Sequence, residues 1–358
     1  MSWFRLGGLR AIIPGLCAGL FLYISVNPAS AEITGNNHAP EGLVEITPGS
    51  RQAVAKGLAY LAAIQAPDGS WGSSGASDPN KYRRHAGITA IACMAFMADG
   101  HLPGRGPYGQ TVTKGLDFVL NHSTASGLIA ADTSHGPLYG HGFATLMLGE
   151  AYGMTRDGRV REALLKAVRL IVDSQNDEGG WRYNPGDFDA DVSVTICQVM
   201  ALRSAKNAGI FVPEQTIEQA VEYVRNCQNP TDGGFRYMAS SGSSQFPRSA
   251  AGLATLYYAG VYDDAALDAG LVYLQNLPDP IGNRGGHFFY GHYYAAQAMY
   301  LAGGEHWANW FPRIRDELVS AQLPDGSWSS PSAGSPYATG MSLIVLQIPN
   351  RLLPIFQR

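Results

Sequence analysis

The stretch KGLAYLAAIQAPDGSWG, residues 56–72, runs from a helical pattern into a turn and ends beside a tryptophan. Gln65, Gly69 and Trp71 are separated by four and two residues. Closely similar spacings return three more times, at Gln175–Trp181, Gln228–Phe235 and Gln322–Trp328. Weaker copies contain Asn121 and Gln275, so the six anchors lie 47 to 56 residues apart. A period near 50 residues indicates an array of similar units.

Each unit contains two helical patterns of different character. Residues 213–228, before an anchor, are apolar on one face and charged on the other, whereas residues 249–261, after it, are apolar or small nearly all round. The second kind of helix must be covered on both faces. Six one-sided helices alternating with six two-sided ones predict an all-α fold, a single α/α toroid with an outer and an inner ring. The glutamine is expected to bond backbone groups at helix ends, and the aromatic residue to cover the gap between units.

The N-terminal region has the features of an export signal. Arg5 and Arg10 precede a short apolar run, and small residues stand at Ala29 and Ala31, which predicts a signal peptide over residues 1–31 and a periplasmic or cell-envelope location. A retained anchor helix is the alternative. Residues 32–48 are expected to form a linker and residues 49–358 the toroid.

Composition excludes some partners. Without the signal peptide the chain has 23 basic and 29 acidic side chains, a formal charge of −6, which indicates no nucleic-acid surface. Cys93, Cys197 and Cys227 lie in apolar helical patterns and are expected to be buried thiols. The apolar tail, residues 347–358, is expected to close the ring against its first helix, with peripheral membrane contact as the alternative.

Because the inner helices run in one direction, their first residues should surround one mouth of the ring. The polar residues at these starts are His85, Tyr139 with His141, Asp189 with Asp191, Arg248 with Ser249, Tyr290 with His292, and Tyr337 with Thr339. Ser249 and Thr339 are expected to cap their helices. Histidine and arginine are poor caps, which favours a ligand-binding mouth. His85, Tyr139, Arg248, Tyr290 and Tyr337 are the predicted substrate-binding residues.

The stretch KGLAYLAAIQAPDGSW resembles the QW repeat of squalene–hopene cyclases, and residues 50–350 resemble the toroid of the terpenoid cyclase and protein prenyltransferase superfamily. The resemblance implies the fold, on which many chemistries occur. The cyclases of that family protonate an alkene with an Asp-x-Asp-Asp motif at the start of an inner helix. The stretch Asp189-Ala190-Asp191-Val192 is similar in place but lacks the last acid. The resemblance implies that Asp191 is the proton donor, with Asp189 beside it.

Prenyltransferases of the superfamily bind zinc through an Asp, a Cys two residues later and a His. His292 resembles that histidine, but the sequence contains no Asp-x-Cys pair. No cofactor is therefore predicted, and zinc would need other ligands, such as His141 or His287 with an Asp. Asp191, Asp189, His292 and His141 remain the candidate catalytic residues.

Three functions stay open. The first is an exported toroid that binds a lipid or isoprenoid, a peptide or a protein at its mouth without chemistry. The second is a terpene cyclase-like enzyme with Asp191 as general acid. Since this chain has one ring where those cyclases use two domains, a dimer or partner protein could supply the missing wall. The third is a glycan-active enzyme, for which Asp191 and Glu150 are the carboxylate pair to compare.

Overall fold

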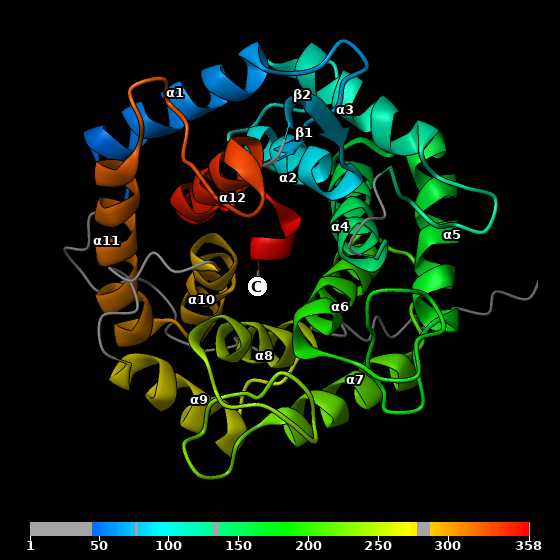
Figure 1. Ribbon diagram of the computed structural model, residues 1–358, viewed down its shortest axis with the longest axis vertical. Coiled ribbons are helices and arrows are strands. Elements are labelled where there is room, and N and C mark those ends of the chain that lie inside the picture. Colours follow the sequence, from blue (N-terminus) through cyan, green and yellow to red (C-terminus); the bar gives the residue numbers. More distant parts are fainter. Residues whose placement is uncertain (1–44, 76–77, 132–135, 278–286, 358) are drawn as a thin grey trace, which may run out of the picture. The chain divides into compact units, whose positions relative to one another are not determined.

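A computed structural model describes residues 45–75, 78–131, 136–277 and 287–357. The predicted signal peptide lies outside the described residues, as does the predicted linker up to residue 44. Within these ranges the chain forms alternating outer and inner helices (Figure 1). The outer helices are α1 (Pro48–Ala63), α3 (Gly109–Asn121), α5 (Gly158–Asp173), α7 (Glu214–Cys227), α9 (Ala265–Asn276) and α11 (Gly304–Ala321). The inner helices are α2 (Ala86–Ala98), α4 (Leu138–Thr155), α6 (Val192–Asn207), α8 (Phe246–Tyr258), α10 (Phe288–Ala302) and α12 (Gly334–Gln347).

The inner helices form a closed ring. Each packs against the next, from α2 through α4, α6, α8 and α10 to α12, and α12 packs against α2. Every residue of α2 is buried, whereas α5 buries only the face with Val160, Ala163, Leu164, Ala167, Val168 and Ile171. The predicted α/α toroid is confirmed, because the two-sided helices are enclosed by the one-sided ones.

Hydrogen bonds across the ring show the direction of the inner helices. The Tyr290 hydroxyl donates to the Ser193 carbonyl at 3.1 Å, and one turn later the Tyr294 hydroxyl lies 3.3 Å from Cys197 Sγ. Both partners advance by four residues together, so α6 and α10 are parallel. The starts of the inner helices therefore share one end of the ring, as predicted.

The repeated glutamine clamps neighbouring units together. Gln175 Nε2 donates to the Gly179 carbonyl at 2.7 Å and to the Thr216 carbonyl of the next outer helix at 2.9 Å. Trp181 is buried and donates from Nε1 to the Ile171 carbonyl at 2.8 Å. The other strong copies repeat the glutamine clamp at Gln65, Gln228 and Gln322. The clamp of Gln322 reaches α1 and closes the outer ring.

The two weak copies lack this clamp among the described residues. Asn121 is the last residue of α3. Gln275 bonds His306 Nδ1 at 2.8 Å in place of the two carbonyls of the clamp. Grooves of about 490 Å³ and 380 Å³ lie at these two positions, between α3 and α5 and between α9 and α11. The outer ring is therefore less tightly joined where the repeat is degenerate.

Ser249 and Thr339 do not cap their helices, contrary to expectation. Each instead accepts the backbone N–H of the preceding motif aromatic residue, Ser249 from Phe235 at 2.8 Å and Thr339 from Trp328 at 3.1 Å. Thr89 and Thr195 do the same in their units. These hydroxyls lie in the wall between a turn and its inner helix.

A hairpin that the sequence did not predict joins the first turn to α2. Its strands β1 (Gly72–Gly75) and β2 (Asp78–Arg84) are antiparallel. Cys93, Cys197 and Cys227 are free and buried, as predicted. Throughout the described ranges, no helix combines the length and apolar character that a membrane span requires.

The C-terminal segment, residues 348–357, turns back over the ring. It contains the 3₁₀ turns η1 (Ile348–Asn350) and η2 (Pro354–Phe356), and η2 packs against α4 and α6. Asn350 Nδ2 donates to the Ala98 carbonyl at the end of α2. The tail therefore covers the C-terminal end of the inner ring, and the expectation that it closes the ring against the first helix is wrong. That closure is made by α12 and Gln322.

Candidate functional site

Asp191 stands at the N-cap of α6, at the mouth formed by the helix starts. Its Oδ1 accepts the backbone N–H groups of Ser193 and Val194 at 2.9 Å and the Ser193 hydroxyl at 2.5 Å. These are the bonds of an N-cap carboxyl, and the side chain is fully buried. Because Oδ1 already accepts three hydrogen bonds, Oδ2 is the oxygen that is able to hold a proton.

Tyrosine hydroxyls surround this carboxyl. Tyr237 donates to Asp191 Oδ2 at 3.2 Å, and its hydroxyl is hydrogen-bonded to that of Tyr183. Tyr139 donates to Ser193 Oγ at 2.7 Å, so a second tyrosine reaches the carboxyl through one intermediate. The Tyr290 hydroxyl bonds the Ser193 backbone from across the ring. The mouth is thus a connected polar network around one acid.

Burial raises the pKa of Asp191 above its ordinary value, against the opposing effects of Ser193, Val194, Arg182 and Tyr237. Among the described residues Asp191 has no ion pair, since Arg182 instead pairs with Asp189 at 2.7 Å. The guanidinium of Arg182 also lies over the rings of Tyr183 and Tyr237, at 5.1 and 5.7 Å. The environment therefore moves the titration of Asp191 to a higher pH than that of an exposed aspartate.

The structure brings several predicted site residues together. Tyr139 and Tyr290 bond Ser193, and Tyr337 is close enough to Tyr290 to affect its pKa. Arg248 lies over the ring of Tyr237 at 5.7 Å. Asp189 is at the edge of the site, with its side chain half exposed and paired to Arg182.

His85 has a different role, as the N-cap residue of α2. Its Nδ1 accepts the N–H groups of Gly87 and Ile88, at 3.1 and 3.3 Å, and so caps α2. The expectation that a histidine at a helix start does not cap is wrong at this position, because the ring nitrogen reaches the same two donors that a carboxylate would.

His141 belongs to the wall rather than to the mouth. Its Nδ1 accepts the Ile129 N–H at 3.2 Å, which is the role that Thr89, Thr195 and Ser249 have in other units. The side chain is fully buried, and burial lowers its pKa to about 4, only partly opposed by the Ala167 backbone on α5. His141 is therefore neutral near pH 7 and interacts with the outer ring.

His292 is packed among aromatic rings between the two rings of helices. Its ring centroid lies 4.4 Å from that of Phe288, 4.8 Å from that of Phe246 and 5.8 Å from that of Trp310 on α11. The structure thus places both candidate catalytic histidines away from Asp191. Throughout the described residues, no three His, Cys, Asp or Glu side chains converge to hold a metal ion.

Four residues of the site are not among those predicted from the sequence: Arg182, Tyr183, Ser193 and Tyr237. A signal for three of them was present, since the motif aromatic residue is followed by Arg-Tyr in two consecutive units, as Trp181-Arg182-Tyr183 and as Phe235-Arg236-Tyr237. In both cases the tyrosine leaves the turn at the mouth. Repetition of this tripeptide could have identified both tyrosines.

Asp191 and Glu150, the carboxylate pair proposed for glycosidic chemistry, do not lie close together. Glu150 is hydrogen-bonded to Ser204, which lies thirteen residues after Asp191 on α6. At 1.5 Å per helical residue the two acids are about 20 Å apart, beyond the roughly 10 Å that such a reaction allows.

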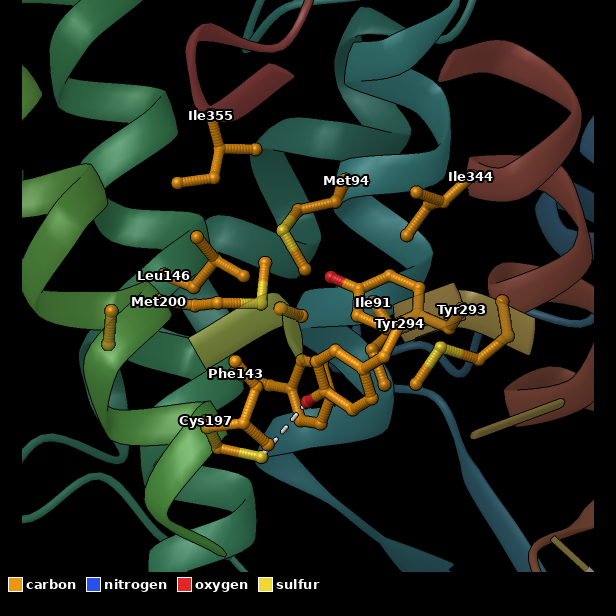
Figure 2. Close-up of a cluster of buried hydrophobic side chains, with 14 of the residues drawn as sticks. Ile91, Met94, Phe143, Leu146, Cys197, Met200, Tyr293, Tyr294, Ile344 and Ile355 are labelled. Atoms are coloured by element: carbon orange, nitrogen blue, oxygen red, sulfur yellow. Dashed lines mark hydrogen bonds between the residues drawn. The ribbon is translucent and has the colours of Figure 1, made fainter. Parts of the chain in front are cut away.

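Below Asp191 the interior of the ring is filled by side chains. Phe143 of α4 and Tyr293 of α10 meet across the ring with centroids 5.9 Å apart. Figure 2 shows these rings together with Tyr294, and the bond from Tyr294 to Cys197. The space below Asp191 is therefore occupied by the protein's own side chains.

The chain is similar to known proteins, although no protein-family model matches it. Drimenyl diphosphate synthase from Streptomyces showdoensis is 27% identical over 234 residues, which are 65% of this chain and 39% of that protein. The chain thus spans about two fifths of the length of this curated relative. The type II terpene cyclase MstE from Scytonema is 13% identical with a TM-score of 0.59, over 85% of this chain and 99% of that one.

MstE has also been solved with geranylgeranyl dihydroxybenzoate as its substrate. An inactive variant of an α-1,6-mannanase from a Salegentibacter species, in complex with α-1,6-mannotriose, is 9% identical with a TM-score of 0.63. That match covers 85% of this chain and 99% of the mannanase chain. At these identities the structural matches indicate a shared fold.

Proposed function

We propose that this α/α toroid, which is similar in sequence to a drimenyl diphosphate synthase and in fold to a type II terpene cyclase, is an acid-catalysed enzyme in which Asp191 protonates a carbon–carbon double bond of an isoprenoid. The observation that carries the proposal is the buried Asp191 carboxyl, which has no ion pair among the described residues and an Oδ2 with one hydrogen-bond partner. An acid of this kind holds its proton at a pH at which an exposed aspartate is ionised.

The reaction would begin with transfer of the proton from Asp191 Oδ2 to one alkene carbon, which leaves a carbocation on the other carbon and a carboxylate on Asp191. The π electrons form the new C–H bond. The π electrons of a second double bond then attack the cation and form a C–C bond, which leaves a new cation. That cation loses a proton to give an alkene, or adds water and releases a proton to give an alcohol, and the carboxylate regains a proton from solvent. The three donors to Oδ1 stabilise the carboxylate while it exists.

The isoprenoid class is supported by the relatives and by the rings around the mouth. The sequence relative is a drimenyl diphosphate synthase, and MstE has been solved with a geranylgeranyl-bearing substrate. In this chain the rings of Tyr139, Tyr183 and Tyr237 lie near Asp191, and guanidinium groups already lie over faces of Tyr183 and Tyr237. Such faces attract a cation, which suits a carbocation intermediate.

The proposal is tested by incubating the purified protein in D₂O with squalene, farnesyl diphosphate or geranylgeranyl diphosphate. We expect a cyclised product that carries deuterium at the protonated carbon, and a loss of about 100-fold or more in Asp191→Asn. Asp173→Asn is the matched control, since Asp173 is an exposed acid on α5, and it should keep most of the activity. Turnover that persists in Asp191→Asn would contradict the proposed role of this carboxyl.

A second candidate is an isoprenoid-binding toroid without chemistry. It is favoured by the filled interior, since Phe143, Tyr293 and Tyr294 occupy the space below the mouth. Native mass spectrometry with the same three compounds separates the candidates. Binding that is equal in the parent protein and Asp191→Asn, with no deuterated product, supports this candidate and rejects the first.

We also propose that the protein acts in the periplasm or cell envelope. The support is the composition of residues 1–31, which is typical of a signal peptide. Mass spectrometry of the protein recovered from cell fractions tests this, since cleavage after Ala31 gives a mature chain that begins at Glu32. A cytoplasmic chain that retains Met1 would contradict it.

A further inference from the structure

The end of the inner ring opposite Asp191 contains a second buried acid, Glu150 of α4. Its Oε1 accepts the Ser204 hydroxyl at 2.6 Å, and its Oε2 accepts the backbone N–H of Ile355 at 3.0 Å. The Glu150 side chain is fully buried, as are the side chains of Leu353, Ile355 and Phe356. A carboxyl therefore forms a direct link between the ring wall and the C-terminal segment.

The C-terminal segment fills the end of the ring at this point. Figure 2 shows Ile355 beside Leu146, Met94 and Met200, which project into the ring interior from three different inner helices. Removal of the segment would uncover this apolar interior to solvent. Ile355 thus functions as part of the core although it comes from the last ten residues of the chain.

The groups that face Glu150 favour its neutral carboxyl over its ionised carboxylate. On α6 it meets the Ser204 hydroxyl, and on η2 an amide; the titratable groups near enough to feel its charge are the hydroxyls of Tyr258 on α8 and Tyr293 on α10. Burial raises the pKa of both tyrosines, so they are neutral near pH 7. Arg203 of α6 acts on Tyr258, and no cation pairs with Glu150 among the described residues.

A protonated Glu150 satisfies every group at this site. Its Oε1–H donates to Ser204 Oγ, the Ser204 hydroxyl donates to the Leu146 carbonyl at 3.3 Å, and Oε2 still accepts from Ile355. An ionised Glu150 is instead a buried charge with no counter-ion, which is costly unless water reaches it. Water reaches it if the C-terminal segment leaves.

We propose that residues 348–357 are a plug that closes one end of the inner ring, and that the proton on Glu150 decides whether the plug is in place. Burial raises the pKa of Glu150 to about 7, so the transition falls near neutral pH. The closed state binds the proton more tightly than the open state. It is therefore favoured at low pH and is lost as the pH rises through about 7.

Hydrogen exchange with mass spectrometry on the full chain tests the plug, with protection of residues 348–357 corrected for the intrinsic exchange rate at each pH. Between pH 5.5 and 8.5 we expect protection in the parent protein to fall by about tenfold or more. Glu150→Gln keeps the shape and both hydrogen bonds but cannot ionise, so its protection should change less than about twofold. Glu162→Gln on exposed α5 is the matched control and should behave as the parent protein.

Ser204→Ala gives a second, independent readout. The Ser204 hydrogen bond lowers the pKa of Glu150, so its loss should move the midpoint of the transition to higher pH. Protection that is independent of pH in the parent protein, or a Glu150→Gln profile like that of the parent, would overturn the proposal. If Glu150→Gln does not fold by circular dichroism, the direction of the Ser204→Ala shift decides. Neither readout depends on turnover at Asp191.

Discussion

The hydroxyl of Tyr237 lies 3.2 Å from Asp191 Oδ2, although 46 residues separate the two in the chain. Asp191 caps α6, and Tyr237 comes from the turn before α8, so one repeat supplies the acid and the next supplies its partner. The protonation state of Asp191 therefore depends on how adjacent units are joined.

Tyr237→Phe should raise the pKa of Asp191 further, because the Tyr237 hydrogen bond favours the ionised carboxyl. The carboxyl would then stay protonated to a higher pH. The C=O stretch of a protonated carboxyl, assigned by its absence in Asp191→Asn, measures this in infrared difference spectra across pH. Tyr262→Phe, at a half-exposed tyrosine, is the control and should leave the titration unchanged.

Gln322→Ala should destabilise the toroid by about 1–3 kcal/mol, because it removes the hydrogen bond to Ala53 that joins α11 to α1 and the bond to Gly326 that closes its own turn. Gln275→Ala should cost less than about 0.5 kcal/mol, since among the described residues this glutamine has one hydrogen bond, to His306 at the surface. Urea unfolding of both variants measures the difference. Equal losses would show that the repeated glutamine is not a clamp.

The stability of the parent protein relative to Glu150→Gln should decrease as the pH rises from about 4.5 to about 7. Glu150 has an ordinary pKa of 4.5 and a folded-state pKa of about 7, so the folded state binds more protons across this window and loses stability with rising pH. The shift corresponds to about 3 kcal/mol. Denaturant titrations of both proteins at several pH values measure it, and a constant difference would contradict the assigned protonation.

His141 should have the opposite pH dependence. Burial lowers its pKa from 6.5 to about 4, so the unfolded chain binds more protons in this window, and the His141 contribution is lost as the pH falls from about 6.5 to 4. His141→Gln keeps an acceptor for the Ile129 N–H, and the parent protein should lose about 3 kcal/mol relative to it over that range. Any isoprenoid turnover should survive this substitution, and its loss would return His141 to the site.

The architecture could be predicted from the sequence because its signals are local and repeated. The spacing of Gln175, Gly179 and Trp181 serves a clamp that each strong unit needs, and the contrast between one-sided and two-sided helices is set by burial alone. The placement of Asp191 at a shared mouth followed from the parallel inner helices.

The residues that make up the site were harder to predict from the sequence, because the site depends on the direction in which each side chain points. Tyr139 and His141 are two residues apart at one helix start, but this spacing turns them by about 200° around the helix. Tyr139 consequently faces the acid and His141 the outer wall. Tyr183 and Tyr237 come from turns, where the repeated aromatic-Arg-Tyr tripeptide is their one local signal, and the apolar composition of residues 348–357 indicates burial but not their place over the end of the inner ring.

Among the N-cap positions of the inner helices that the structure describes, Asp191 is the one carboxylic acid; the other positions hold His85, Pro137, Gln245, His287 and Ala333. The ring of inner helices is thus nearly six-fold in its backbone but has an acid at one of its six N-cap positions. An alkene seated in that mouth would meet its acid from a single side, so addition to a prochiral carbon would give one enantiomer in excess.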